Sequence, residues 1–206
     1  MILKVFGLTG GPGCGKSTVS RFFSATRQWQ VVDADAVCHD LYAKPEPALA
    51  DGLRRLFGPS VLSPEGAVDR KTLAACVLSS SDRLHALNEL VHPFIFKEVR
   101  ARIRQFASEP MTSLHGILLD APLLFETGMD SLTPSGVIAV WTDPATQQER
   151  LLARGWSKAD LAARIAGQLP ASEKLALADF GLVSRGDFSF LYEQCKRLMN
   201  FLTYQI

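Results

Sequence analysis

The chain has few cysteines, and none of them lies in a disulfide-like or metal-binding pattern. Cys14, Cys38, Cys76 and Cys195 are the four in 206 residues, and no two form a C-x-x-C pair. Their spacing fits no zinc motif. We therefore expect free thiols in a reducing compartment, and a core that needs neither disulfides nor a structural metal.

Long hydrophobic runs and an excess of charge of one sign are also missing. No apolar run approaches the ~18 residues that suggest a membrane span, and the apolar start ends at Gly7 without the basic leader of a signal peptide. The 22 Lys and Arg nearly balance 21 Asp and Glu, which argues against a surface dedicated to nucleic acid or anionic membrane. We expect a soluble, cytoplasmic protein that binds neither. The oligomeric state, a homo-oligomer included, stays open.

Strand-like and helical patterns alternate along most of the chain. Short apolar segments typical of buried strands cover 1–9, 30–33, 116–121, 136–141 and, more weakly, 181–183. Helical periodicity covers 17–26, 144–154 and 188–202. This alternation predicts an α/β fold of three layers, in which helices cover both faces of a parallel sheet.

One segment, 36–110, breaks the alternation because it is almost entirely helical in pattern. One apolar stripe contains Leu49, Leu53 and Leu56, and another runs from Leu84 to Ile103. About seventy residues between two strands exceed an ordinary crossover connection. We therefore predict an inserted helical lobe at 36–110 within a single domain that covers 1–206.

The strongest motif lies between the first strand and the first helix. The run Gly10-Gly11-Pro12-Gly13-Cys14-Gly15-Lys16-Ser17 matches G-x-x-x-x-G-K-[ST] at every fixed position. Its backbone amides and the helix start that follows can bind phosphate oxygens. Lys16 can reach the β- and γ-phosphates, and Ser17 can bind Mg²⁺. The predicted ATP-binding residues are Gly11, Pro12, Gly13, Cys14, Gly15, Lys16, Ser17 and Thr18. The alternative is a glycine-rich turn that matches by accident.

Three carboxylates stand at or just beyond the ends of predicted strands. Asp33 and Asp35 end the second strand, where open α/β sheets bind ligands, and either can orient or deprotonate an attacking hydroxyl. The alternative is that one of them caps the next helix. Asp120 ends the third strand, a position from which an acid can assist Mg²⁺; otherwise it caps the following turn.

Arginines and one histidine complete the set of candidates. Arg150, Arg154 and Arg164 follow the fourth strand and can stabilise charge on a transferring phosphoryl group. Without the phosphate-binding motif, a solvated helix face would be the better interpretation. His92 lies in the predicted lobe, and by itself it fits a structural role better than a substrate contact.

Taken together, these residues resemble the dephospho-CoA kinase family from Met1 to about Asp187. Besides the phosphate-binding motif, the resemblance covers Val32-Asp33-Ala34-Asp35, Leu90-Val91-His92-Pro93 and Pro122-Leu123-Leu124-Phe125-Glu126. It continues through Gln148-Glu149-Arg150 with Arg154, Arg164 with Gln168, and Ala178-Asp179-Phe180.

The resemblance implies a P-loop kinase with a core, a helical CoA-binding lobe and a lid at 145–175. ATP and dephospho-CoA would be the substrates, Mg²⁺ the metal, and the ribose 3′-hydroxyl the acceptor. Asp35 would orient that hydroxyl, with Lys16 and Arg154 as further catalytic residues. Substrate contacts would come from Asp33, Asp35, His92, Pro122 and Leu123. The lid arginines would be Arg150, Arg154 and Arg164, and the metal contacts Ser17 and Asp120.

The chain departs from the family pattern at three places. Cys38-His39 stands where the family usually has Ala-Arg, and Ser184-Arg185-Gly186 stands where an Asn is often found. Cys14 replaces a common Ser in the phosphate-binding motif, which works through its backbone.

Three other functions compete with this one. Another small-molecule or nucleoside-monophosphate kinase would carry a similar loop and similar arginines. A GTPase is suggested only by Ser157-Lys158-Ala159-Asp160, which does not follow a strand. A non-catalytic ATP-binding module is disfavoured because Lys16, Asp35 and Arg154 are all intact.

Overall fold

The computed structural model describes residues 3–77, 80–108, 114–157, 160 and 164–204. Parts of three predicted segments therefore lie outside the described residues: 1–2 of the first strand, 78–79 and 109–110 of the lobe, and 158–159 and 161–163 of the lid. The chain divides into two compact units. Unit 1 comprises residues 1–32 and 105–206, and unit 2 comprises residues 33–104.

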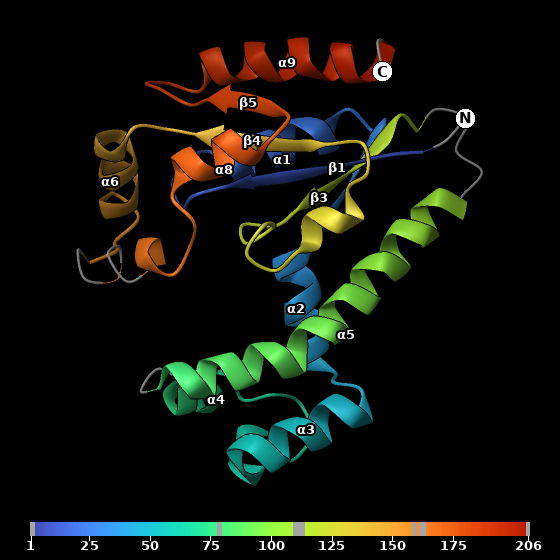
Figure 1. The fold of residues 1–206 in the computed structure, drawn as a ribbon, viewed down its shortest axis with the longest axis vertical. Coiled ribbons are helices and arrows are strands. Elements are labelled where there is room, and N and C mark those ends of the chain that lie inside the picture. Colours follow the sequence, from blue (N-terminus) through green and yellow to red (C-terminus); the bar gives the residue numbers. More distant parts are fainter. Residues whose placement is uncertain (1–2, 78–79, 109–113, 158–159, 161–163, 205–206) are drawn as a thin grey trace. The chain divides into compact units, whose positions relative to one another are not determined.

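A five-stranded sheet in the order β2-β3-β1-β4-β5 forms the centre of unit 1 (Figure 1). The strands are β1 (Lys4–Gly10), β2 (Trp29–Asp33), β3 (Gly116–Asp120), β4 (Val137–Trp141) and β5 (Phe180–Val183). The central strand β1 pairs in parallel with β3 and β4, and β4 pairs in parallel with β5. The predicted parallel sheet is confirmed, and the carboxyl ends of β1 and β3 lie at one edge because Leu8 is opposite Asp120.

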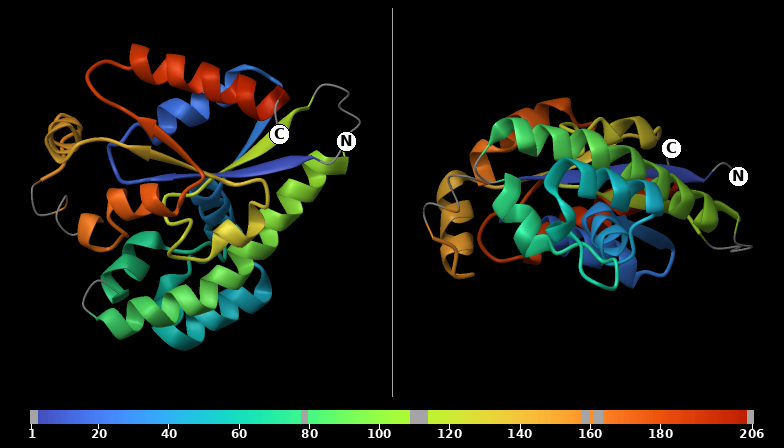
Figure 2. Two further views of the ribbon diagram at one scale, coloured as in Figure 1. Left: turned by 45° about the horizontal axis from the view of Figure 1, so that its top comes forward. Right: turned by 90° about the horizontal axis from the view of Figure 1, so that it is seen from below.

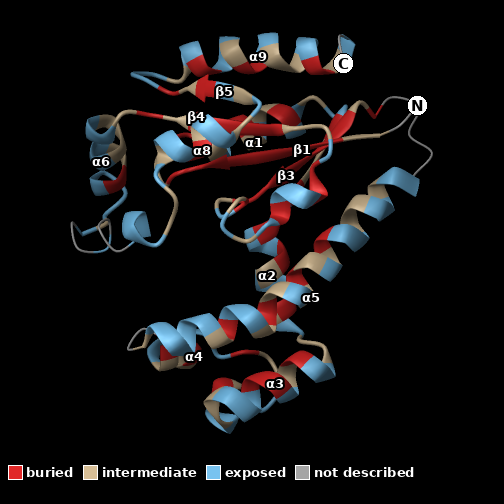
Figure 3. Ribbon diagram, viewed as in Figure 1, coloured by how far each residue is buried: buried red, intermediate tan, exposed pale blue. Residues whose placement is uncertain are grey.

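Helices cover both faces of this sheet (Figure 2). On one face, α1 (Lys16–Ala25) packs against α9 (Ser189–Tyr204). On the other face lie α8 (Ala171–Leu177) and the short 3₁₀ helix η2 (Met129–Leu132). A further helix, α6 (Pro144–Leu152), follows β4. A hydrophobic core cluster of buried residues includes Phe6, Leu8, Phe23, Trp29 and Leu191. In Figure 3 the central strands of the sheet are coloured mostly as buried.

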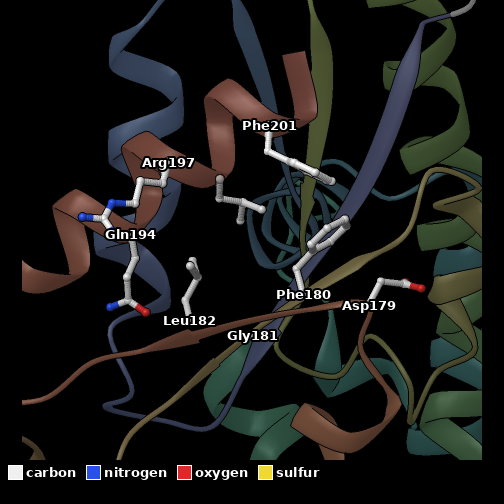
Figure 4. Close-up of a pocket in the computed structure, with 8 residues that line it drawn as sticks. Asp179, Phe180, Gly181, Leu182, Gln194, Arg197 and Phe201 are labelled. Atoms are coloured by element: carbon white, nitrogen blue, oxygen red, sulfur yellow. The ribbon is translucent and has the colours of Figure 1, made fainter. Parts of the chain in front are cut away.

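At the edge of the sheet, β5 is closed by a side chain of α9. The Gln194 amide accepts a hydrogen bond from Val183 N (2.9 Å) and donates one to Val183 O (2.7 Å), as a neighbouring strand would. Farther along the strand, a mostly apolar groove opens between β5 and α9 (Figure 4). There Phe180 and Phe201 meet edge to face with ring centroids 6.0 Å apart.

Unit 2 is helical. It contains α2 (Ala34–Ala43), α3 (Pro47–Phe57), the 3₁₀ helix η1 (Pro59–Val61), α4 (Arg70–Val77) and most of α5 (Ser81–Ser108). Pro93 lies inside α5, and the helix bends near its middle in Figure 1, as the missing N–H of a proline requires. Among the described residues, no helix combines the length and the apolar character needed to cross a bilayer.

The sequence pattern predicted the strands and long helices of unit 1 to within a few residues, but it missed α8 and η2. Both are short, and α8 has a fully buried lysine on its inner side. In unit 2, Leu56 and Leu84 are 47% exposed although they belong to the predicted apolar stripes. The buried faces of α3 and α5 are narrower than the spacing of leucines indicated. Cys14, Cys38, Cys76 and Cys195 are free thiols, as expected.

We expect Gly116→Ala to destabilise the protein. A methyl group at Gly116 would lie 2.6 Å from the buried indole ring of Trp29, and overpacking of this kind costs about 1–3 kcal/mol. In a Trp29→Phe background the ring is smaller, so the added cost of Gly116→Ala should shrink. Urea unfolding of the four proteins in this cycle measures the coupling. Equal costs in both backgrounds would contradict the proposed contact.

Candidate active site

The phosphate-binding loop follows β1 and is held so closely that Gly10, Gly13 and Gly15 have no room for a side chain. Gly13 and Gly15 have φ values of 75° and 97°, in the region that glycine alone adopts readily. A methyl group at Gly13 would lie 2.9 Å from Leu151 Cγ, and one at Gly15 would lie 2.9 Å from Ser184 Oγ. The glycines therefore allow both the turn of the loop and the close approach of its neighbours.

Helix α6 supports this loop from behind. Gln147 donates a 2.7 Å hydrogen bond to Pro12 O. Arg150 donates to Gly13 O (3.4 Å), Ser184 Oγ (2.9 Å) and Gly186 O (3.1 Å). These contacts tie the loop to the segment that follows β5. The sequence pattern did not reveal them, because the partners are distant in sequence and mostly backbone oxygens.

Arg150 is therefore a bracing residue, and its predicted place in a lid stays a prediction. Its guanidinium also stacks 4.8 Å from the centroid of the Phe188 ring. Ser184, at one of the departures from the family pattern, is completely buried and receives the Arg150 hydrogen bond. A pocket opens beside this brace, lined by Thr146, Glu149, Arg150, Ala153 and Gly186.

At the start of α1, Lys16 forms an ion pair with Asp120 at the end of β3. The Lys16 side chain is 16% exposed and that of Asp120 is 6% exposed. A charge with so little solvent is costly unless it is paired. The structure therefore brings together two of the predicted site residues, one from the phosphate-binding loop and one from the neighbouring strand.

The residues at this edge fit a magnesium ion that is held mainly by a nucleotide. Ser17 is exposed at the start of α1, and Asp120 provides a carboxylate. Mg²⁺ prefers such hard oxygen ligands and usually takes only one or two from the protein, with the rest from phosphates and water. In the part of the chain that the structure describes, no group of three or more His, Cys, Asp or Glu forms a metal site by itself.

Cys14 in the phosphate-binding loop is a buried thiol. Burial raises its pKa, against the opposing effects of hydrogen bonding and of the positive charges of Lys16 and Lys174. The thiol therefore stays protonated at neutral pH, where it acts as a small apolar group. This agrees with the expectation that the loop works through its backbone rather than through this side chain.

Sequence reasoning missed a second lysine near the site, Lys174 of α8. Its side chain is 0% exposed, and its ammonium pairs with Glu126 at 2.8 Å. It also donates to the backbone oxygen of Pro122, two residues after Asp120. Pro122 and Leu123 were predicted as substrate contacts; Pro122 is partly buried and Leu123 is 37% exposed.

In unit 2, Asp33 is the N-cap of α2. Its Oδ1 accepts hydrogen bonds from Asp35 N (2.9 Å) and Ala36 N (3.1 Å), which is the usual geometry of a capping aspartate. The carboxylate of Asp35 lies in the first turn and is exposed. Of the two acids that the sequence left as alternatives, Asp33 thus performs the capping.

The remaining residues of interest in unit 2 are His92, Cys38 and His39, of which the first two are partly buried. His92 of α5 is half-buried, and burial lowers its pKa, so its imidazole is neutral at physiological pH. Burial raises the pKa of Cys38, and a hydrogen bond with Tyr42 opposes this effect. His39, the other residue of that departure from the family pattern, is exposed beside Asp40.

The predicted lid is described only in part. Arg154 is exposed just after α6. The Arg164 guanidinium lies 4.7 Å from the centroid of the Trp156 ring, a cation–π contact. Lys158 and Ala159 of the weak guanine-like motif lie outside the described residues. The roles of Arg154 and Arg164 in a lid stay predictions.

The fold and the site define a P-loop nucleotide-binding protein of the kinase type. A family model described as "Dephospho-CoA kinase" matches residues 4–188. The chain therefore belongs to the dephospho-CoA kinase family, as the resemblance predicted.

Curated relatives and solved structures agree with this assignment. The chain is 38% identical to a dephospho-CoA kinase of Bdellovibrio bacteriovorus over 97% of its length and 96% of the relative's. It is 35% identical to one of Carboxydothermus hydrogenoformans, over 94% and 92%. The crystal structure of TT1252 from Thermus thermophilus matches with a TM-score of 0.77 at 31% identity, over 98% of this chain and 100% of that one. A shikimate kinase from Bacteroides thetaiotaomicron shares the fold, with a TM-score of 0.54 at 15% identity over 98% and 99%.

We expect Arg150→Ala to weaken ATP binding by roughly tenfold or more, because hydrogen bonds to charged groups each contribute about 1.5–3 kcal/mol. Arg150→Lys should recover little, because a compact ammonium lacks the two separated NH₂ groups with which the guanidinium reaches Gly13 O, Ser184 Oγ and Gly186 O. Titration calorimetry with a non-hydrolysable ATP analogue measures the effect. Arg197→Ala, at an exposed site on α9, is the control. Unchanged affinity in Arg150→Ala would show that the brace is dispensable.

Proposed function

We propose that this protein transfers the γ-phosphate of ATP to the ribose 3′-hydroxyl of dephospho-CoA, which gives CoA. The observation that carries the proposal is the complete phosphate-binding loop, braced by α6 and joined to Asp120 through Lys16, in a chain that matches the dephospho-CoA kinase model over residues 4–188. The family membership identifies the acceptor, and the loop accounts for the phosphate donor.

Unit 1 would bind and polarise the donor. The amides of the loop and the start of α1 present N–H groups to the β- and γ-phosphates. Lys16 has three donors on one ammonium, so it can bind phosphate oxygens as negative charge shifts toward the leaving group in the transition state. The pocket beside Arg150 is a suitable place for the nucleoside of ATP, because it adjoins the loop and contains a stacking guanidinium.

Unit 2 would bind and orient the acceptor. Asp35 has an exposed carboxylate in the first turn of α2, and Asp33 is the N-cap of the same helix. A carboxylate that accepts a hydrogen bond from the ribose hydroxyl orients its lone pair for attack and can take up its proton. His92, neutral because of burial, is a candidate donor or acceptor for the CoA portion. Asp33 of unit 2 and Pro122 and Leu123 of unit 1 are further predicted contacts.

The metal and the lid belong to the same proposal. Mg²⁺ would bind to ATP with Ser17 and Asp120 as protein ligands, directly or through water, and would neutralise phosphate charge. Arg154 and Arg164 would contact the phosphates when the lid closes over ATP. Free thiols at all four cysteines suit the reducing cytoplasm that we propose as its location.

A comparison of acceptors tests the proposed function. With saturating Mg-ATP, kcat/KM should be much higher for dephospho-CoA than for AMP or adenosine, because remote contacts of the longer substrate help to align the reacting hydroxyl. Mass spectrometry should detect CoA as the product, and Lys16→Ala should nearly abolish it at a temperature at which circular dichroism shows the variant to be folded, because the variant also leaves the Asp120 carboxylate without its ion pair. Comparable kcat/KM for AMP would refute the assignment to dephospho-CoA.

The capping geometry gives a matched pair of variants at the acceptor site. Asp35→Asn should lower kcat by about 10²–10⁴-fold, with a smaller effect on KM for dephospho-CoA. Asp33→Asn should be mild, because asparagine caps helices about as well as aspartate. Steady-state kinetics and thermal melting of both variants decide the matter. If Asp33→Asn lost most of its kcat and Asp35→Asn kept a nearly normal kcat, the roles of the two residues would be reversed.

A further inference from the structure

Lys174 on α8 is fully buried. The proposed chemistry does not by itself explain a buried positive charge at this position. Lysine is almost never buried completely unless it is paired, because the loss of hydration is expensive. In α8, Ala171–Leu177, the buried residue is Lys174, whereas Leu177 is 59% exposed. The position therefore calls for an explanation in terms of its partners.

The ammonium of Lys174 has three donors, and three oxygens surround it. Glu126 Oε1 lies at 2.8 Å, Gln168 Oε1 at 3.4 Å, and the third partner is the backbone oxygen of Pro122. The same Glu126 oxygen also accepts a 2.8 Å hydrogen bond from Leu169 N. Lys174 and Glu126 thus join the start of α8 and the residues before it to the segment that follows β3.

The contact with Pro122 places this cluster next to the proposed chemistry. Pro122 O also accepts a 3.1 Å hydrogen bond from Thr9, a buried residue at the end of β1 just before the phosphate-binding loop. Asp120, the partner of Lys16, lies two residues before Pro122. The start of α8 also adjoins the loop, since a methyl group at Gly11 would lie 3.7 Å from Ala171 Cβ. One backbone oxygen thus receives donors from both α8 and β1.

We propose that Lys174 is a positioning residue for phosphoryl transfer, whose buried ammonium holds the Pro122 carbonyl and so fixes the backbone that carries Asp120 beside the phosphate-binding loop. This inference rests on the proposed kinase function. Lys174 would act through Asp120 and Lys16, not through contact with substrate. Without the ammonium, Pro122 O keeps the hydrogen bond from Thr9 but loses the one from α8, so the backbone just after Asp120 is held less firmly, and a misplacement of about 1 Å can cost on the order of 100-fold in rate.

The test needs a variant that removes the charge without leaving Glu126 unpaired. Lys174→Met keeps the length of the side chain, and Glu126→Gln keeps an oxygen for Leu169 N while it removes the negative charge. Replacement of a buried ion pair by groups of similar volume is often neutral for stability. The double variant Lys174→Met/Glu126→Gln should therefore stay folded, with ATP-analogue affinity within about threefold of wild type and kcat lowered by about 10–100-fold.

The matched control is Gly116→Ala, which lowers stability at the opposite end of β3 without touching the cluster. At a temperature where both proteins are fully folded by circular dichroism, the control should keep a nearly normal kcat. The Mg²⁺ concentration for half-maximal rate should rise in the double variant and not in the control. If Lys174 were purely structural, the double variant would, like the control, at most lose melting temperature and would keep the wild-type kcat and Mg²⁺ dependence.

A folded double variant with wild-type kcat and Mg²⁺ dependence would overturn the proposal. If the double variant does not fold, Lys174→Leu/Glu126→Gln decides, because it removes both charges and the hydrogen bond to Pro122 O with a shorter side chain. We expect it to lose about tenfold or more in kcat with unchanged KM for ATP, and an unchanged kcat would overturn the proposal. A wild-type enzyme that prefers another acceptor would refute the CoA assignment, and the same comparison would then be made with that acceptor.

Discussion

A loop that binds phosphate through its backbone amides must be held in shape from outside, because its glycines have no side chains to pack. In this protein the support comes from close contact: Leu151 and Ser184 lie where side chains of Gly13 and Gly15 would be. Gln147 and Arg150 add hydrogen bonds to the loop carbonyls. The glycines of the motif thus serve two needs, the turn of the backbone and the approach of the elements that support it.

The residues that support the loop explain why one departure from the family pattern is compatible with the site. Ser184 replaces a residue at which asparagine is often found, and its buried hydroxyl accepts a hydrogen bond from Arg150. A small side chain is required here, because Gly15 passes so close to it. Arg150 then completes the brace through Gly13 O, Gly186 O and the face of Phe188. Ser184 therefore supports the phosphate-binding loop by packing against Gly15 and by accepting the Arg150 hydrogen bond.

The sequence predicted the features that depend on local pattern, namely the strands, the long helices and the phosphate-binding motif. It narrowed but did not resolve the choice between Asp33 and Asp35, because either acid suits a helix start; only the hydrogen bonds of Asp33 to two amides identify the cap. Lys174 was not foreseen at all. A lysine in a polar stretch is ordinarily exposed, and its burial depends on Glu126 and Pro122, some fifty residues earlier in the chain. Long-range pairing of this kind leaves no local periodicity.

The segment from Asp120 to Glu126 has a carboxylate at each end, and each carboxylate forms an ion pair with a lysine from a different helix. Asp120 pairs with Lys16 of α1, and Glu126 pairs with Lys174 of α8. Without phosphate, Lys16 would be a poorly hydrated cation, and Asp120 compensates its charge. When an anionic ligand binds, the three donors of Lys16 can be shared between carboxylate and phosphate. Lys174 has no such freedom, because all of its donors are directed to protein oxygens. One ion pair can therefore respond to ligand while the other keeps the connecting backbone in place, which is the division of work that a preorganised phosphoryl-transfer site requires.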